Sequence, residues 1–128
     1  MPVHWTVSHS QHLVVAVTKG HVSVSDIEKY FAGVTADGAM SYAKIFEITH
    51  TPEALNDENL KTLGQRVIFY AEHGQVGPVA IVAATEESYA KATVFAEAAR
   101  VSRPLMIFRE LHAARRWVEA QKDAAPPA

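Results

Sequence analysis

The sequence predicts one small α/β domain, in which a mixed, mostly parallel five-stranded sheet is combined with four helices in the order β-β-α-β-α-β-α-β-α. Two short segments at the start are typical of a hairpin, and further strand-like segments then alternate with segments of helical periodicity. Val79–Ala84 is apolar throughout, as a parallel strand covered on both faces must be. We therefore expect a domain over residues 1–121 and a flexible tail over 122–128.

The first hairpin and the first helix are predicted from a change in the spacing of apolar residues along the sequence. Residues 3–8 alternate apolar and polar side chains, and Leu13–Val17 is an apolar run of strand length, so Ser8–His12 is the expected hairpin loop. The next segment carries its apolar side chains at helical spacing, at Ile27, Tyr30, Phe31 and Val34. Ser23 is the expected N-cap of this helix and Gly38 its expected stop.

The remaining elements alternate between strand and helix along the chain. In order they are the strand Tyr42–Thr49, a helix capped by Asn56, the strand Pro78–Ala84, a helix capped by Thr85, the strand Leu105–Phe108 and the helix Leu111–Gln121. Helices between the third, fourth and fifth strands require right-handed crossovers and parallel pairing. The class is therefore α/β.

The composition excludes several kinds of protein. The chain has no cysteine, which excludes disulfides, thiolate metal sites and cysteine nucleophiles. No apolar run reaches the roughly 20 residues that a membrane span needs, and Met1–Trp5 lacks the basic and apolar pattern of a leader. The net charge is −2, with no basic stripe interleaved with aromatic residues. We expect a cytoplasmic protein with no nucleic-acid partner and no transmembrane segment.

Nucleotide chemistry and acyl transfer are both disfavoured. No glycine-rich turn leads from a strand into a helix, and the helix starts carry acids such as Glu86 and Glu87, which would repel phosphate. No serine lies in the glycine-flanked elbow that hydrolases use. Among the seven histidines, His4, His9 and His12 surround the first hairpin, but their spacing matches no metal motif. We expect neither a cofactor nor a metal ion.

One candidate for catalysis lies where the third strand ends. His50 follows this strand between Thr49 and Thr51, at the edge where open parallel sheets place their ligands. Glu86 and Glu110 follow the fourth and fifth strands and could approach the same edge. A small hydrolase or isomerase that uses His50 and one of these carboxylates as acid and base is therefore one hypothesis. The simpler interpretation is a loop histidine that bonds to solvent.

Several segments together resemble the SpoIIAA-like branch of the STAS superfamily. The resemblance rests on the order of elements, on Gly77–Val82 before a helix, and on Ile107–Glu110 leading into an alanine-rich helix that ends in Trp117-Val118. It spans nearly the whole chain. The resemblance implies a small non-enzymatic domain, used for regulation through protein–protein contacts and sometimes for sensing a small ligand.

In phospho-regulated members of that family, a serine opens the helix after the third strand. This sequence has Asp57 in that place, within Asn56-Asp57-Glu58-Asn59-Leu60, where a fixed carboxylate could hold one charge state permanently. The leading hypothesis is therefore a regulatory domain that binds a protein partner at the loop Thr49–Asp57 and the following helix. The candidate binding residues are Thr49, His50, Thr51, Asn56, Asp57, Glu86 and Arg109.

The fold and the first hairpin each suggest another kind of partner. The fold is similar to lipid-binding domains of the Sec14 type, which implies a small apolar ligand as the alternative function. The exposed edge of the first hairpin could also pair two copies of the chain into a homodimer. The side chains that could line a ligand cavity are Phe46, Leu55, Phe69, Tyr89 and Phe95.

Overall fold

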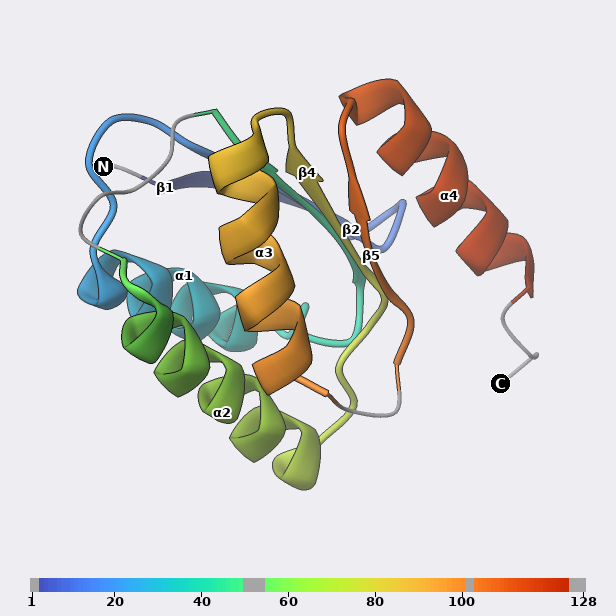
Figure 1. Cartoon of the computed structure of the whole chain (residues 1–128). Coiled ribbons are helices and arrows are strands. Elements are labelled where there is room, and N and C mark those ends of the chain that lie inside the picture. The colour runs from blue at the N-terminus through green and yellow to red at the C-terminus, as the bar shows by residue number, and fades with distance from the viewer. Residues whose placement is uncertain (1–2, 50–54, 101–102, 125–128) are drawn as a thin grey trace.

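The computed structural model describes residues 3–49, 55–100 and 103–124. Its elements follow the expected order and are shown in Figure 1. They are β1 (Val3–Ser8), β2 (Leu13–Thr18), α1 (Val24–Ala36), β3 (Ala43–Ile48), α2 (Asp57–His73), β4 (Val79–Ala83), α3 (Glu86–Ala98), β5 (Leu105–Phe108) and α4 (Leu111–Ala124). The last helix continues to Ala124, beyond the expected end at Gln121.

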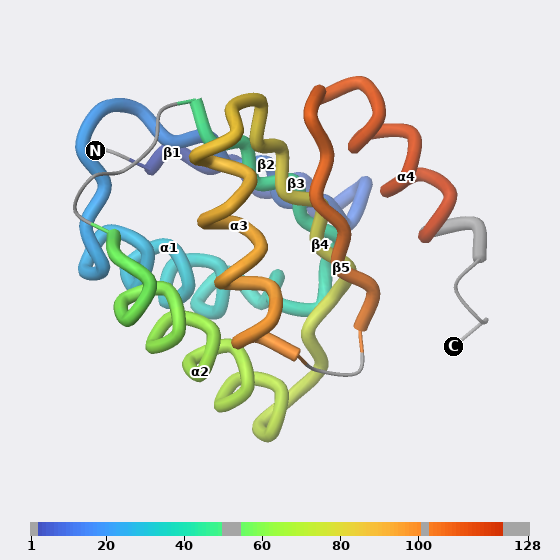
Figure 2. The backbone as a smooth tube through the Cα atoms, in the orientation of Figure 1, coloured from blue at the N-terminus to red at the C-terminus, as the bar shows by residue number. Residues whose placement is uncertain are grey.

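The five strands form one sheet in the order β1-β2-β3-β4-β5. β1 pairs with β2 antiparallel, and every later neighbour pairs in parallel, so the predicted mixed and mostly parallel α/β sheet is confirmed. Figures 1 and 2 show α1, α2 and α3 on one side of the sheet and α4 on the other. β1 is therefore an edge strand, as the hairpin predicts, although homodimer formation stays a prediction.

The two faces of β3 meet different layers because successive side chains of a strand point to opposite faces. Ala43 and Ile45 pack with Ala114 and Val118 of α4. Lys44, Phe46 and Ile48 lie on the other face, which α1, α2 and α3 cover. A lysine thus occupies a position whose neighbours on the same face are apolar.

Both ends of α1 form as the sequence predicts. Ser23 caps α1, its Oγ accepting from the Asp26 backbone N–H at 3.2 Å while the Asp26 carboxylate accepts from the Ser23 N–H at 2.9 Å. These hydrogen bonds, from the backbone first, hold the pKa of Asp26 below its usual value. Gly38, at φ 68°, ends the helix, and the Ala39 N–H donates to the Val34 carbonyl at 3.0 Å.

Two glycines let segments that are distant in sequence approach closely. A Cβ at Gly77 would overlap the carbonyl oxygens of Ser41 and Tyr42, so the loop before β4 can lie against the loop before β3 only without a side chain there. A Cβ at Gly64 of α2 would lie 2.7 Å from the backbone carbonyl carbon of Ala98 in α3. The first of these contacts shapes one end of the site described below.

Candidate functional site

A cavity of about 110 Å³ lies between the sheet and the three helices α1, α2 and α3. Most of the side chains that line it are apolar or aromatic, which is typical of small-molecule sites. The principal contributors are Phe46, Ile48, Val79 and Ile81 from the sheet, Tyr30 and Phe31 from α1, Leu63 and Val67 from α2, and Ala92 and Phe95 from α3. The cavity is thus lined by side chains on the inward-facing sides of the strands and helices, which also form the hydrophobic core.

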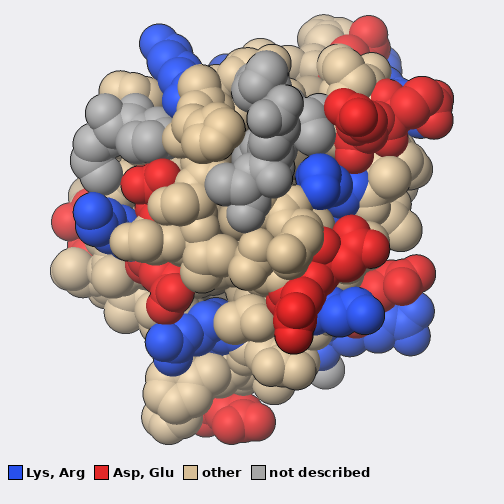
Figure 3. Space-filling model, turned by 60° about the vertical axis from the view of Figure 1, so that its left-hand side comes forward, with Lys and Arg blue, Asp and Glu red and all other residues tan. Residues whose placement is uncertain are grey.

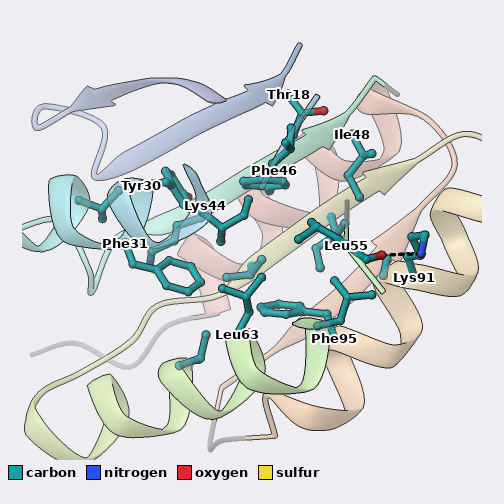
Figure 4. A pocket seen from close by; sticks show the side chains of 18 of the residues that line it. Thr18, Tyr30, Phe31, Lys44, Phe46, Ile48, Leu55, Leu63, Lys91 and Phe95 are labelled. Atoms are coloured by element: carbon teal, nitrogen blue, oxygen red, sulfur yellow. Dashed lines mark hydrogen bonds between the residues drawn. The ribbon is translucent and has the colours of Figure 1, made fainter. Parts of the chain in front are cut away.

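The cavity extends along β3, as Figure 4 shows. Lys44 and Tyr30 lie toward one end, whereas Ile48 and Lys91 lie toward the other. At this second end the Nζ of Lys91 donates to the carbonyl oxygen of Leu55 at 2.6 Å. Since a strand rises about 3.3 Å per residue, Lys44 and Ile48 are separated by roughly 13 Å along β3.

Lys44 is the most deeply buried charged residue among those that the structure describes, with 5% of its surface exposed. Its Nζ donates to the carbonyl oxygen of Tyr42 at 2.9 Å and to that of Met40. An ammonium carries three donors, and the described residues supply acceptors for two of them. Burial, and then repulsion by Arg103, lowers the pKa of Lys44 to about 7.

Arg103 lines the same cavity from the segment that precedes β5. Its Nη1 donates to the carbonyl oxygen of Gly77 at 3.3 Å, but its Nε is buried and has no hydrogen-bond acceptor among the described residues. Burial lowers the pKa of this guanidinium to about 10, an effect that nearby Tyr30 opposes. Tyr30 itself stays protonated at neutral pH, because burial raises the pKa of its hydroxyl.

The described residues that line the cavity carry charges of one sign only. Among the described residues, the charged side chains that line it are Lys44, Lys91 and Arg103, and no aspartate or glutamate joins them. Tyr30 supplies no negative charge at neutral pH. An apolar cavity with a cationic end is therefore suited to an anion that carries an apolar body.

The predicted site at the carboxyl ends of the strands is only partly assembled. Arg109 and Glu86 form an ion pair at 3.2 Å, and the Arg109 guanidinium lies 4.3 Å from the centre of the Tyr89 ring. Both members of the pair are solvent-exposed. Such a pair contributes about 0–1 kcal/mol, and neither residue is part of the cavity lining.

The other predicted residues serve the local backbone or lie outside the described ranges. The Thr49 N–H donates to the Thr18 Oγ1 at 3.1 Å, and the Thr49 Oγ1 donates to the Thr18 carbonyl oxygen. Asn56 caps α2 by accepting from the Asn59 N–H at 2.8 Å, with Asp57 exposed as the first helical residue. His50 and Thr51 lie outside the described residues, so the acid–base hypothesis and partner docking at this edge stay predictions.

Sequence reasoning found part of the cavity. Phe46, Leu55 and Phe95 do line it. Phe69 does not, because its side chain is 48% exposed, and Tyr89 packs instead beneath Arg109 and against the apolar cluster around Ile81. The predicted lining lacks Lys44, although a lysine inside the apolar run around Ile45 is a signal in the sequence.

The histidines of the first hairpin contact an aromatic ring. His9 Nδ1 lies 2.7 Å from the hydroxyl oxygen of Tyr42, and the ring of His12 packs edge-on against Tyr42 at 4.9 Å between ring centroids. Within the described ranges, no three histidine, aspartate or glutamate side chains are grouped in a way that could hold a metal ion.

Charges of both signs are mixed on one face of the molecule. On the face shown in Figure 3, Lys and Arg side chains alternate with Asp and Glu over the described residues. In the part of the chain that the structure covers, no helix combines the length and the apolar character needed to cross a bilayer.

Comparison with known proteins identifies no family for this chain. No protein-family model matches the chain, and no match to it is found among curated proteins or among solved structures. The resemblance to the SpoIIAA-like proteins therefore stays a prediction, and the function must be argued from the cavity.

Proposed function

We propose that this protein binds a small apolar molecule in the cavity between its sheet and α1, α2 and α3. The observation that carries the proposal is the lining of the cavity, which is largely apolar and is drawn from all three helices and three strands, β2, β3 and β4. An engineered cavity of about 150 Å³ with similar walls binds benzene. A volume of about 110 Å³ is accordingly suited to a small ring or a short alkyl chain.

Binding without turnover is the activity that these walls support. The polar groups at the cavity ends, Lys44 and Lys91, both donate to backbone carbonyl oxygens. The ion pair of Glu86 and Arg109, which the sequence placed in the candidate site, is exposed and is not part of the lining. We therefore propose a carrier or sensor of a small ligand, which is compatible with a STAS-like regulatory domain.

The test uses an uncharged probe and two matched variants. Hexanol should raise the melting temperature of the wild-type protein, because a ligand that binds only the folded state stabilises it. Ala92→Leu, which adds a side chain at a buried position lining the cavity, should abolish the shift. Ala120→Leu makes the same change at an exposed position on α4, across the sheet, and should preserve it.

A second measurement covers the case in which hexanol differs too much from the natural ligand to bind. Native mass spectrometry of protein purified from its own host should show a small copurifying molecule that unfolding releases. A clean apoprotein mass, together with no thermal shift from hexanol or from hexanoate, would refute the proposed function.

A further inference from the structure

The two cations at one end of the cavity require an explanation that apolar binding alone does not supply. Burying an unpaired charge is costly, and two like charges raise that cost further. Lys44 and Arg103 nevertheless both line this end, where burial lowers the pKa of each and repulsion by Arg103 lowers that of Lys44 further. No carboxylate among the described lining residues compensates for them.

Lys44 and Arg103 also have N–H donors that lack an acceptor among the described residues. Two donors of Lys44 are used by the carbonyl oxygens of Met40 and Tyr42, which leaves one without an acceptor among the described residues. Arg103 uses Nη1 on Gly77, and its buried Nε has no acceptor there. Since buried donors in native proteins are almost always satisfied, an acceptor with negative charge fits this end of the cavity.

We propose that the ligand is a small monocarboxylate, with its carboxylate at Lys44 and Arg103 and its apolar body along the walls formed by Phe46 and Phe95. This inference rests on the proposed function and adds the chemical class of the ligand. A planar carboxylate suits a guanidinium, which donates in a fixed plane. The roughly 13 Å between Lys44 and Ile48 along β3 accommodates a short chain that starts at the cationic end.

A carboxylate fits better than a more highly charged head group. The carbonyl oxygens of Met40 and Tyr42 both face Lys44, and they would repel a second negative charge placed beside the ammonium. A small cavity of about 110 Å³ also leaves little room for a phosphate in addition to an apolar body. Hexyl phosphate is therefore included in the test as a competing probe.

The experiment compares probes that share an apolar body and differ in the head group. Hexanoate, hexanol and hexylammonium are titrated into the wild-type protein at pH 6.5, where Lys44 is mostly protonated, and dissociation constants are measured by calorimetry. Hexanoate should bind at least about tenfold more tightly than hexanol, and hexylammonium more weakly than either, because a hydrogen bond to a charged group adds more than a neutral one.

Variants then test which residues bind the carboxylate of hexanoate. Lys44→Met should weaken hexanoate about tenfold or more and leave hexanol unchanged, and Arg103→Met should act in the same direction. Arg116→Gln, at an exposed position on α4 across the sheet, serves as a control for net charge, because it also removes one positive charge. If Lys44→Met fails to fold, the comparison of hexanoate with hexanol on the wild type still decides the question.

The outcomes separate this inference from the proposed function. Equal binding of hexanoate and hexanol would overturn the carboxylate assignment while leaving an apolar ligand in place. Tighter binding of hexyl phosphate than of hexanoate would overturn the choice of head group. No binding of any probe, with a clean apoprotein mass, would remove both proposals.

Discussion

The backbone N–H of Gly77 donates to the carbonyl oxygen of Met40 at 3.0 Å, and the same oxygen accepts a hydrogen bond from the Nζ of Lys44. This shared acceptor connects the loop before β4 to the loop before β3. Arg103 extends the connection, since it donates to the carbonyl oxygen of Gly77. The cationic end of the cavity is therefore held by backbone groups from two loops.

Gly77→Ala should destabilise the protein by about 1–3 kcal/mol, because the added Cβ would overlap the carbonyl oxygens of Ser41 and Tyr42 and push the loops apart. Urea denaturation measures the change. Gly74→Ala is the matched control, since nothing lies within 4 Å of a Cβ there and its backbone is extended. Equal effects of the two substitutions would show that the close approach at Gly77 does not stabilise the fold.

The stability of the protein should depend on pH through Lys44. Its pKa is about 7 in the folded chain and 10.5 for an ordinary lysine, so between these values the unfolded chain binds more protons and stability rises with pH. Below about pH 7 both states are protonated, and the burial penalty is fully present. Relative to Lys44→Met, the wild type should gain about 2 kcal/mol from pH 7 to pH 9.

This comparison is made by urea denaturation of both proteins at each pH. The series stops at pH 9 because the raised pKa of Tyr30 would lower stability at higher pH, where the unfolded tyrosine ionises. A difference between wild type and Lys44→Met that stays constant over the series would contradict the burial of an ionisable Lys44.

Hexanoate affinity should fall as the pH rises above about 7, by up to about tenfold per pH unit, because a neutral Lys44 no longer attracts the carboxylate. Of the other titratable groups that line the cavity, Arg103 stays charged below its pKa of about 10, and Tyr30 stays neutral. Tyr70 of α2 and Lys91 of α3 complete the set among the described residues.

Calorimetry in buffers of different ionisation enthalpy should show proton uptake on binding hexanoate at pH 8 and none on binding hexanol. Lys44→Met should remove both the uptake and the pH dependence. Proton uptake of the same size in Lys44→Met would assign it to another group.

The ion pair at the carboxyl ends of the strands should not contribute to this binding. Arg109→Gln and Glu86→Gln each remove one partner of an exposed pair, so stability should change by less than about 1 kcal/mol. The dissociation constant of hexanoate should be unchanged in both variants. Tenfold weaker binding in either one would place the ligand at the edge that the sequence suggested.

The fold could be predicted from sequence because its signals are local. The caps at Ser23, Asn56 and Thr85 and the apolar run that became β4 each depend on residues a few positions apart. The end of α4 was placed too early, because residues beyond Gln121 carry no strong stop signal before the prolines near the end of the chain.

The site was harder to predict because it depends on contacts between distant segments. Lys44 and Arg103 are brought to one cavity by the parallel pairing of β3, β4 and β5, and neither belongs to a motif. The sequence pattern favours a site at the carboxyl ends of the strands, whereas these two cations lie near the amino ends of β3 and β5. A lysine between Ala43 and Ile45 was the local sign that a buried charge needs a partner.

The most direct measurement is a crystal structure of the protein with hexanoate that carries bromine on its terminal carbon. We expect anomalous bromine density inside the cavity, between Phe46 and Phe95 or closer to Ile48, with the carboxylate within hydrogen-bonding distance of Lys44 Nζ and the guanidinium of Arg103. A cavity filled by the protein's own side chains, or bromine bound only on the outer surface, would contradict the account.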